Sequence, residues 1–328
     1  MGAGRVIRRS RPVSFRQSRA SLPATLAPSR VGSMRLSTVI LPIHRWAEGQ
    51  KIWRRAEDLG FHAAYTYDHL SWRSFRDEPW FGAVPTLTAA AAATERIRLG
   101  TLVTSPNFRH PVTLAKELVS VDDVSGGRLT VGIGAGGTGF DATAMGQEAW
   151  SPRERADRFG EFLPLLDKLL RQDATTETGT YYSAVEARNI PGCVQTPRVP
   201  FYVAATGPRG LKLAAEYGQG WVTYGDPRGP ADVPVAQAPS VIKSQIEKLT
   251  VACEATGRDV ATLEKVLLQG STAEKPLQSV DAFVDWAGAY RELGVTELVI
   301  HWPVPDSIFA NDLAVFERIA TEGLAQLG

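Results

Sequence analysis

The chain has 328 residues, 44% of them hydrophobic, so it is long enough to bury a substantial core in one or two domains. Its formal charge of +1 gives no overall field that favours nucleic acid or a membrane surface, and no apolar run is long enough to predict a membrane span. The two cysteines, Cys193 and Cys253, form no CxxC pair, which is typical of free thiols in the cytoplasm.

The first segment in chain order, residues 1–33, is predicted to be a leader that does not fold. It contains seven arginines and no aspartate or glutamate, which leaves a formal charge of −6 for the rest of the chain. It has no hydrophobic period, and its Arg- and Ser-rich composition is typical of disorder or of a transit peptide. No apolar stretch follows the pair Arg8-Arg9, as a secretory signal would require. We therefore place one folded domain at 34–328 and expect the leader to be dispensable for folding.

From Met34 onward, strand-like and helix-like patterns alternate. Strands are predicted at 35–41, 62–67, 97–104, 128–134, 200–205, 220–224, 265–269 and 297–302. Helices are predicted at 46–59, 83–94, 111–124, 152–171, 208–217, 240–256, 279–293 and 306–320. The first helix stops at Gly60 and the third begins with Pro111, which are the usual places of these two residues. Two connections, 172–199 and 225–239, are predicted to be loops.

Every predicted strand is followed by a helix, and this alternation predicts parallel strands joined by helical crossovers. Eight such units in one continuous domain favour an α/β fold of the closed (β/α)8 barrel type. An open doubly wound sheet is the alternative. It would place a Gly-rich turn after the first strand, but this chain has Leu41-Pro42-Ile43-His44 there. No internal repeat and no second domain are evident.

Polar side chains gather at the ends of the predicted strands, which is where barrel enzymes carry their active sites. His44 follows the first strand, Asp68-His69 the second and His301 ends the eighth. Asp68 and His69 are adjacent, so in a regular strand they point in opposite directions. An aspartate here is equally suited to capping the next turn. The tryptophans at 72, 221 and 302 are candidates for the pocket and equally for the core.

The stretch Ala205-Thr206-Gly207-Pro208-Arg209 is a predicted anion site. Its small residues open a helix, so unpaired N–H groups and the positive end of the helix dipole face outward, with Arg209 and Lys212 at the rim. The Gly-rich run 132–139 is weaker evidence, because glycines also serve loops that need positive φ. No HxxxH, HExxH or acidic cluster occurs, so no metal site is predicted.

The chain resembles the luciferase-like superfamily of flavin- and deazaflavin-dependent oxidoreductases over nearly all of residues 34–320. The resemblance rests on YDHL at the second strand, on IRLGTLVTSPNFRHPVTLAKELVSVDDVSGGRLTVGIGAG across the third and fourth strands, on PRERADRFGEFLPLLDKLL and on VPFYVAATGPRGLKLAAEYGQGW. Each motif is modest alone, but their order on eight strand–helix units is specific. The resemblance implies a barrel that binds FMN, or the deazaflavin coenzyme F420, at its C-terminal face.

The resemblance also implies roles for individual residues. Leu102-Val103 would back the central ring of the cofactor, often through a non-proline cis peptide. His69 would lie near the hydride-accepting carbon and exchange a proton there, next to Asp68, and His44 and His301 are further catalytic candidates. The residues that would hold the cofactor are Asp68, His69, Leu102, Val103, Ser105, Gly136, Gly137, Ala204, Ala205, Thr206, Gly207, Pro208 and Arg209.

Three functions follow as hypotheses. The leading one is an F420-dependent oxidoreductase that moves a hydride to or from a small organic substrate. The alternative is a monooxygenase that uses reduced FMN from a separate reductase, and the third is a non-catalytic binding barrel. Glucose-6-phosphate-oxidising relatives carry a glutamate where this chain has Gly137, and their set of lysines is missing, which argues against sugar-phosphate oxidation. Expected partners are a small-molecule substrate, a cofactor-regenerating reductase and a second copy of the chain, but no nucleic acid or membrane.

Overall fold

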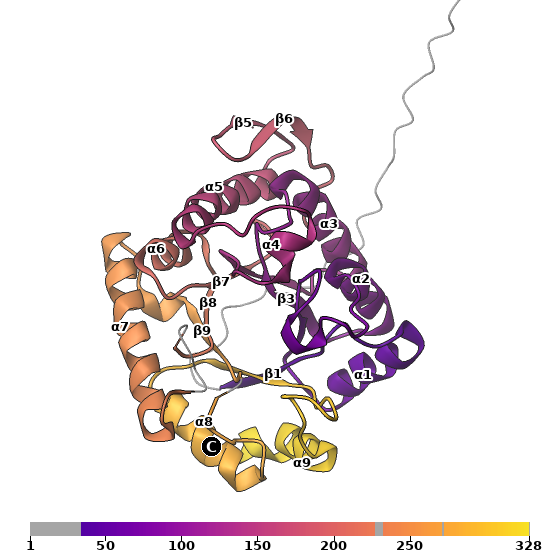
Figure 1. The fold of residues 1–328 in the computed structure, drawn as a ribbon, viewed down its shortest axis with the longest axis vertical. Helices are drawn as coiled ribbons and strands as arrows, with labels where there is room; N and C mark the ends of the chain where they lie inside the picture. Colours follow the sequence, from indigo (N-terminus) through magenta and orange to yellow (C-terminus); the bar gives the residue numbers. More distant parts are fainter. Residues whose placement is uncertain (1–33, 227–231, 271, 328) are drawn as a thin grey trace, which may run out of the picture. The chain divides into compact units, whose positions relative to one another are not determined.

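The computed structural model describes residues 34–226, 232–270 and 272–327, and for residue 327 the backbone alone. The predicted leader lies outside the described residues. Within them, parallel strands close into a barrel in the order β1-β10-β9-β8-β7-β4-β3-β2, and helices surround it (Figure 1). This confirms the predicted (β/α)8 fold.

Most of the barrel strands are shorter than predicted, and all of them lie where the apolar runs placed them. Their bounds are β1 Arg35–Val39, β2 Ala63–Thr66, β3 Arg98–Thr104, β4 Leu129–Gly134, β7 Phe201–Ala204, β8 Gly220–Thr223, β9 Glu264–Leu268 and β10 Glu297–His301. The main helices are α1 Trp46–Asp58, α2 Ala83–Ala93, α3 Pro111–Val124, α5 Pro152–Arg171, α6 Pro208–Tyr217, α7 Ala238–Ala255, α8 Val280–Glu292 and α9 Leu313–Arg318.

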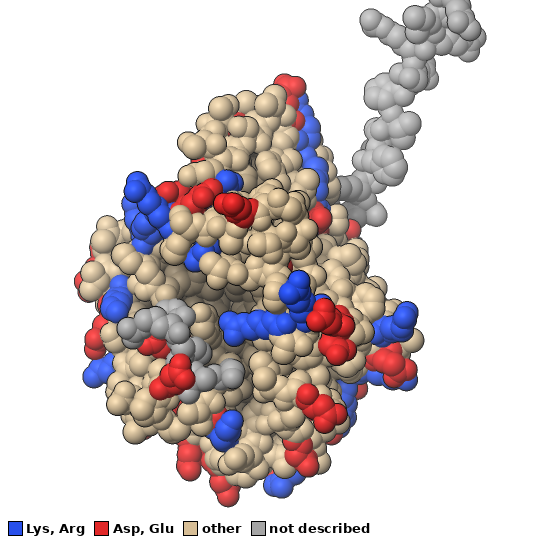
Figure 2. Space-filling model, viewed as in Figure 1, with Lys and Arg blue, Asp and Glu red and all other residues tan. Residues whose placement is uncertain are grey.

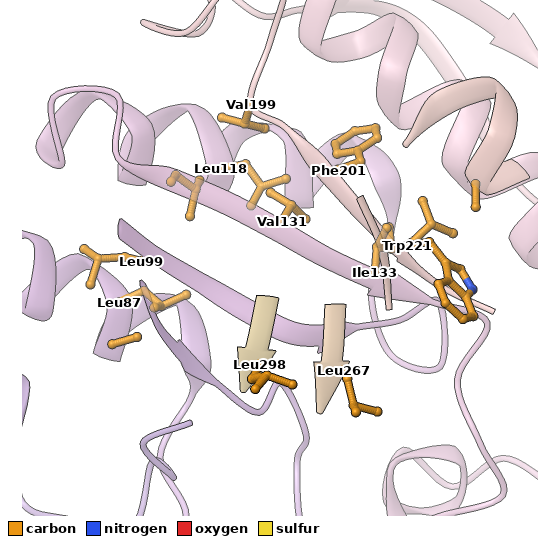
Figure 3. Close-up of a cluster of buried hydrophobic side chains, with 14 of the residues drawn as sticks. Leu87, Leu99, Leu118, Val131, Ile133, Val199, Phe201, Trp221, Leu267 and Leu298 are labelled. Atoms are coloured by element: carbon orange, nitrogen blue, oxygen red, sulfur yellow. The ribbon is translucent and has the colours of Figure 1, made fainter. Parts of the chain in front are cut away.

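The strands bury both of their faces, as parallel barrel strands must. On β2, Ala64 faces the helices, whereas Ala63 and Tyr65 belong to the core inside the barrel. The outer core lies between strands and helices. Its members in Figure 3 include Leu99, Val131, Phe201 and Leu298 from strands, with Leu87 and Leu118 from helices. Alternation along a strand therefore decides which side chains line the interior.

A buried polar cluster fills the interior at the end where the strands begin. The Glu297 carboxylate, fully buried, accepts hydrogen bonds from Ser37 Oγ at 2.7 Å and from Tyr65 OH at 2.9 Å, and Arg35 lies 3.5 Å away. These contacts plug the N-terminal end of the barrel. The open end is therefore the one where the strands finish.

Two predictions about local structure were wrong, and one short helix was not predicted. The connection 172–199 contains an antiparallel hairpin, β5 Ala174–Thr178 with β6 Ser183–Arg188, whose strands are mostly exposed and so lack the alternation of a half-buried strand. The Gly-rich loop after β4 continues into a short helix, α4 Phe140–Ala144. The last helix begins at Leu313 and not at residue 306, because Asp306 has a φ of 55° and Asp312 supplies the cap to Val315 N–H.

No helix in the described ranges has the length and apolarity needed to cross a membrane. Both cysteines are free, and burial raises the pKa of the Cys193 thiol to about 11.

Candidate active site

The strand ends surround a mouth at the C-terminal end of the barrel. The view in Figure 2 is hollowed near its centre, over the strands that Figure 1 shows. The loops after β2, β3, β4 and β7 carry most of the predicted cofactor-binding residues.

The wall of this mouth contains an irregularity in β3. The pairing of β3 with β4 shifts register between Thr101 and Thr104, and the Leu102-Val103 peptide is cis, as the resemblance implied. The bulge fits closely against β4: a Cβ on Gly132 would lie 2.2 Å from the Thr101 carbonyl oxygen, so no other residue fits there. Leu102 is buried inside the barrel and Val103 is half-buried beside it.

Asp68 is held by an arginine from the β3 loop. Arg109 donates from Nε to Asp68 Oδ2 at 3.0 Å and from Nη2 to Oδ1 at 2.7 Å, and its Nη1 donates to Glu117 at 2.9 Å. Burial alone would lower the pKa of Arg109, but the bonds to Asp68 outweigh it and the pKa is raised. Asp68 is only 1% exposed. Both of its oxygens therefore tie the β2 loop to the β3 loop.

His69 is held by a carboxylate that the sequence did not single out. Its Nδ1–H donates to Asp141 Oδ2 at 2.5 Å, and the other oxygen of Asp141 accepts the Leu70 N–H at 2.6 Å. Trp80 Nε1–H donates to the His69 carbonyl at 2.8 Å. His69 Nε2 has no hydrogen-bond partner among the described residues, and its side chain is 28% exposed. Nε2 is the nitrogen left for chemistry.

The surroundings of His301 do not suit a proton donor, because its ring is buried and both of its nitrogens are occupied. Its ring is buried and stacks on Phe309 with centroids 3.9 Å apart. Nδ1–H donates to the Gln269 carbonyl at 2.9 Å, so Nε2 accepts the hydrogen bond of Tyr67 OH at 2.7 Å. Burial, against the opposing bond to Gln269, lowers the pKa of His301 to about 3, and burial raises the pKa of Tyr67. His301 therefore stays neutral and orients the Tyr67 hydroxyl.

His44 lies apart from these two histidines. It lines a groove of about 670 Å³ between the loops that follow β1, β2 and β10, together with Phe75 and Glu78. Burial lowers the pKa of His44, although Glu48 acts in the opposite direction. Phe75 also stacks on Trp72 and Phe309, so an aromatic cluster borders both the groove and Tyr67.

The loops after β3 and β4 meet at Asn107. Its Nδ2 donates to the Gly137 carbonyl at 3.0 Å, while its buried Oδ1 has no hydrogen-bond partner among the described residues. Gly136 has a φ of +76°, and a Cβ there would lie 2.4 Å from Asn107 Oδ1. The buried Ser105 precedes this pair. An unpaired acceptor beside a glycine loop fits a ligand that carries an N–H group.

The predicted anion site begins α6 as expected. Gly207 is the N-cap and Pro208 the first helical residue, after Ala204 and the half-buried Ala205 and Thr206. The first turn leaves backbone N–H groups that the helix cannot pair. The exposed Arg209 donates to Asp157 of α5 at 2.5 Å, so its charge is shared with a carboxylate.

The tryptophans split between pocket and core. Trp72 and Trp80 stack near Tyr67, 6.4 Å apart. Trp221 and Trp302 belong to the outer core, which is one of the two places that the sequence left open for them. Sequence reasoning missed the roles of Asp141, Tyr67 and Asn107. The sequence did contain a signal for Asp141. This acid follows the fourth strand and His69 follows the second, so both were expected at the same end of the barrel.

The family can now be stated from a match to a family model. Residues 24–272 match the model described as luciferase-like monooxygenase. The chain belongs to the luciferase-like monooxygenase family. The match covers the ends of the barrel strands from β1 to β9 but not β10, and it confirms the resemblance found in the sequence.

Curated relatives within this family have two kinds of activity. An F420-dependent glucose-6-phosphate dehydrogenase of Beutenbergia cavernae is 38% identical over 51% of this chain and 49% of its own length. An F420-dependent hydroxymycolic acid dehydrogenase of Mycobacterium tuberculosis is 31% identical over 64% of this chain and 54% of its own. A 4-hydroxyprotoasukamycin monooxygenase of Streptomyces nodosus subsp. asukaensis is 30% identical over 76% and 67%. The chain spans about half the length of the glucose-6-phosphate dehydrogenases it matches.

Solved structures confirm the fold of this luciferase-like chain. An F420-dependent secondary alcohol dehydrogenase superposes with a TM-score of 0.72 at 20% identity, covering 89% of this chain and all of the other. A monooxygenase from Streptomyces bottropensis superposes with a TM-score of 0.70 at 20% identity, covering 90% and 98%. At such identities the likeness concerns the barrel alone.

Proposed function

We propose that this luciferase-like chain is an F420-dependent oxidoreductase that moves a hydride between the deazaflavin and a small organic substrate at the C-terminal mouth of the barrel. The observation that carries the proposal is His69, whose Nδ1 is bound to Asp141 and whose Nε2 is unpaired and partly exposed at the end of β2. A histidine held in this way can give or take the proton that accompanies hydride transfer. Relatives named as F420-dependent dehydrogenases support the choice of cofactor.

The residues present fit a flat heterocyclic cofactor. The bulge at Leu102-Val103 offers a wall for its ring, and Asn107 Oδ1 offers a buried acceptor for a ring N–H. Gly136 and Gly137 bring backbone close to that edge, and the first turn of α6 offers N–H groups for a phosphate in the tail. When bound, the deazaflavin supplies the hydride chemistry.

Proton transfer, positioning and exclusion of water would depend on this chain's own side chains. His69 Nε2 would hold or release the proton at the reacting substrate oxygen or carbon. Asp68, already bound to Arg109, would keep the β2 loop in place, and Tyr67, oriented by His301, would offer a neutral hydroxyl nearby. Trp72 and Trp80 would exclude water and provide an apolar wall for the substrate.

A monooxygenase that uses reduced FMN is the second candidate. The relative that favours it is the 4-hydroxyprotoasukamycin monooxygenase, and the match to it covers 76% of this chain. This activity would need a separate reductase to supply reduced flavin. A homodimer is compatible with either activity.

Turnover with a panel of alcohols, aldehydes and enones, measured in parallel with and without oxygen, tests the leading function. The visible absorbance of F420 should fall or rise with at least one substrate pair, and no oxygen should be consumed. If turnover occurs only with reduced FMN and oxygen, the monooxygenase is the function. If neither cofactor supports turnover of any panel member, the non-catalytic binding barrel becomes the favoured function.

A further inference from the structure

From the contacts of α4 we infer that Asp141 is a positioning residue that fixes the tautomer and the ring orientation of His69. This inference rests on the proposed function of His69 as the proton-transfer group. It concerns a residue from the β4 loop that acts on a residue from the β2 loop, 72 positions earlier in the chain.

The Asp141 carboxylate is built into the site and is not a surface charge. Its side chain is 2% exposed, and each of its oxygens has a separate partner. Oδ2 accepts from His69 Nδ1–H, and Oδ1 accepts from the backbone N–H of Leu70, the next residue. One carboxylate therefore holds both the ring of His69 and the backbone behind it.

Trp80 and Tyr67 also contact His69. Trp80 binds the His69 carbonyl at 2.8 Å, and the rings of Tyr67 and Trp80 lie 6.0 and 6.5 Å from the His69 ring. Because a carboxylate can only accept here, Nδ1 carries the hydrogen and Nε2 keeps its lone pair. The fixed negative charge also stabilises the imidazolium that forms when Nε2 takes a proton.

A purely structural role is the competing explanation, since the same contacts also attach α4 to the β2 loop. Asp141→Asn separates the two roles. Its amide oxygen can still accept from Leu70 N–H, but the charge is gone. Asp122→Asn is the matched control: Asp122 is equally buried and accepts from Val194 N–H and Gln195 N–H, far from any histidine contact.

The test uses ¹⁵N NMR of the protein without cofactor, with the His69 signals assigned through His69→Gln, alongside the turnover of the loaded enzyme. In the unaltered protein at neutral pH, Nδ1 should carry the hydrogen and Nε2 should not. In Asp141→Asn, whose amide can donate as well as accept, the Nε2–H tautomer of His69 should become populated. Turnover at neutral pH should fall about tenfold or more. Asp122→Asn should lose stability and keep the Nδ1–H tautomer.

The NMR arm does not depend on which cofactor the enzyme uses. If F420 fails to bind but the Nε2–H tautomer appears in Asp141→Asn, the proposed function is wrong and the pairing stands. An Nε2–H tautomer in the unaltered protein would overturn the inference even if Asp141→Asn does not fold. A folded Asp141→Asn that keeps only the Nδ1–H tautomer, or a change of tautomer equalled by Asp122→Asn, would overturn it too.

Discussion

Replacing Asp68 by asparagine should destabilise the fold more than replacing Glu117, the more exposed carboxylate that binds the same arginine, by glutamine. Asp68 is 1% exposed and receives two hydrogen bonds from Arg109, whose side chain is 16% exposed. Removing one partner of a fully buried ion pair costs about 3–5 kcal/mol, because the other charge is left without compensation. Arg109 keeps Glu117 at 2.9 Å and some solvent, so we reduce the expected loss to about 2–3 kcal/mol.

Urea unfolding and thermal melting of the apo protein measure this loss. For a chain of this size it corresponds to a fall in Tm of about 3–5 °C. Glu117→Gln is the control, because Glu117 binds the same guanidinium from a side chain that is 39% exposed. That change should cost less than about 1 kcal/mol. Equal losses in the two variants would refute the assignment of Asp68 as the anchor between the β2 and β3 loops.

Four further outcomes are expected. His69→Ala should lower turnover by about 10²–10⁴ while cofactor affinity, measured by titration, falls less; unchanged turnover would remove His69 from the chemistry. His301 has a lowered pKa of about 3, so its neutral form contributes stability that is present above pH 6.5 and lost as the pH falls toward 3. The unaltered protein should therefore lose about 2 kcal/mol more than His301→Gln between pH 6.5 and pH 5 in urea unfolding, and parallel pH curves would contradict this. Arg209→Glu should weaken cofactor binding at low salt, because it places a second negative charge beside Asp157 at the start of α6; an unchanged dissociation constant puts the phosphate elsewhere. A chain that begins at Met34 should melt at the same temperature as the full chain, and loss of soluble protein would show that the leader contributes to folding.

Much of the barrel could be predicted because its strands are buried on both faces and separated by Gly and Pro signals. Runs such as 128–134 and 297–302 are apolar enough to be recognised as strands from this single sequence. The hairpin β5–β6 gave no such pattern, since its strands are mostly exposed. The start of α9 was misplaced because the left-handed backbone of Asp306 cannot be inferred from residue type alone.

The location of the candidate site at the strand ends could be predicted from the sequence, but the contacts between its residues could not. The rule that barrel sites lie at strand ends placed His69 and His301 correctly, yet it assigned them similar roles. Only the three-dimensional contacts separate them. His301 has both nitrogens occupied, by Gln269 and Tyr67, whereas His69 has one nitrogen occupied by Asp141. Such partners come from other strands and loops, so no local pattern reveals them.

The central claim, that this luciferase-like barrel uses the deazaflavin, is tested most directly by equilibrium titration of the purified apo protein with F420 and, separately, with FMN. The proposal predicts saturable F420 binding that is clearly tighter than FMN binding and that weakens when Asn107, the residue with the unpaired buried acceptor, is changed to leucine. FMN binding that is equal or tighter, or F420 binding that is unaffected by Asn107→Leu and Arg209→Glu alike, would contradict the account.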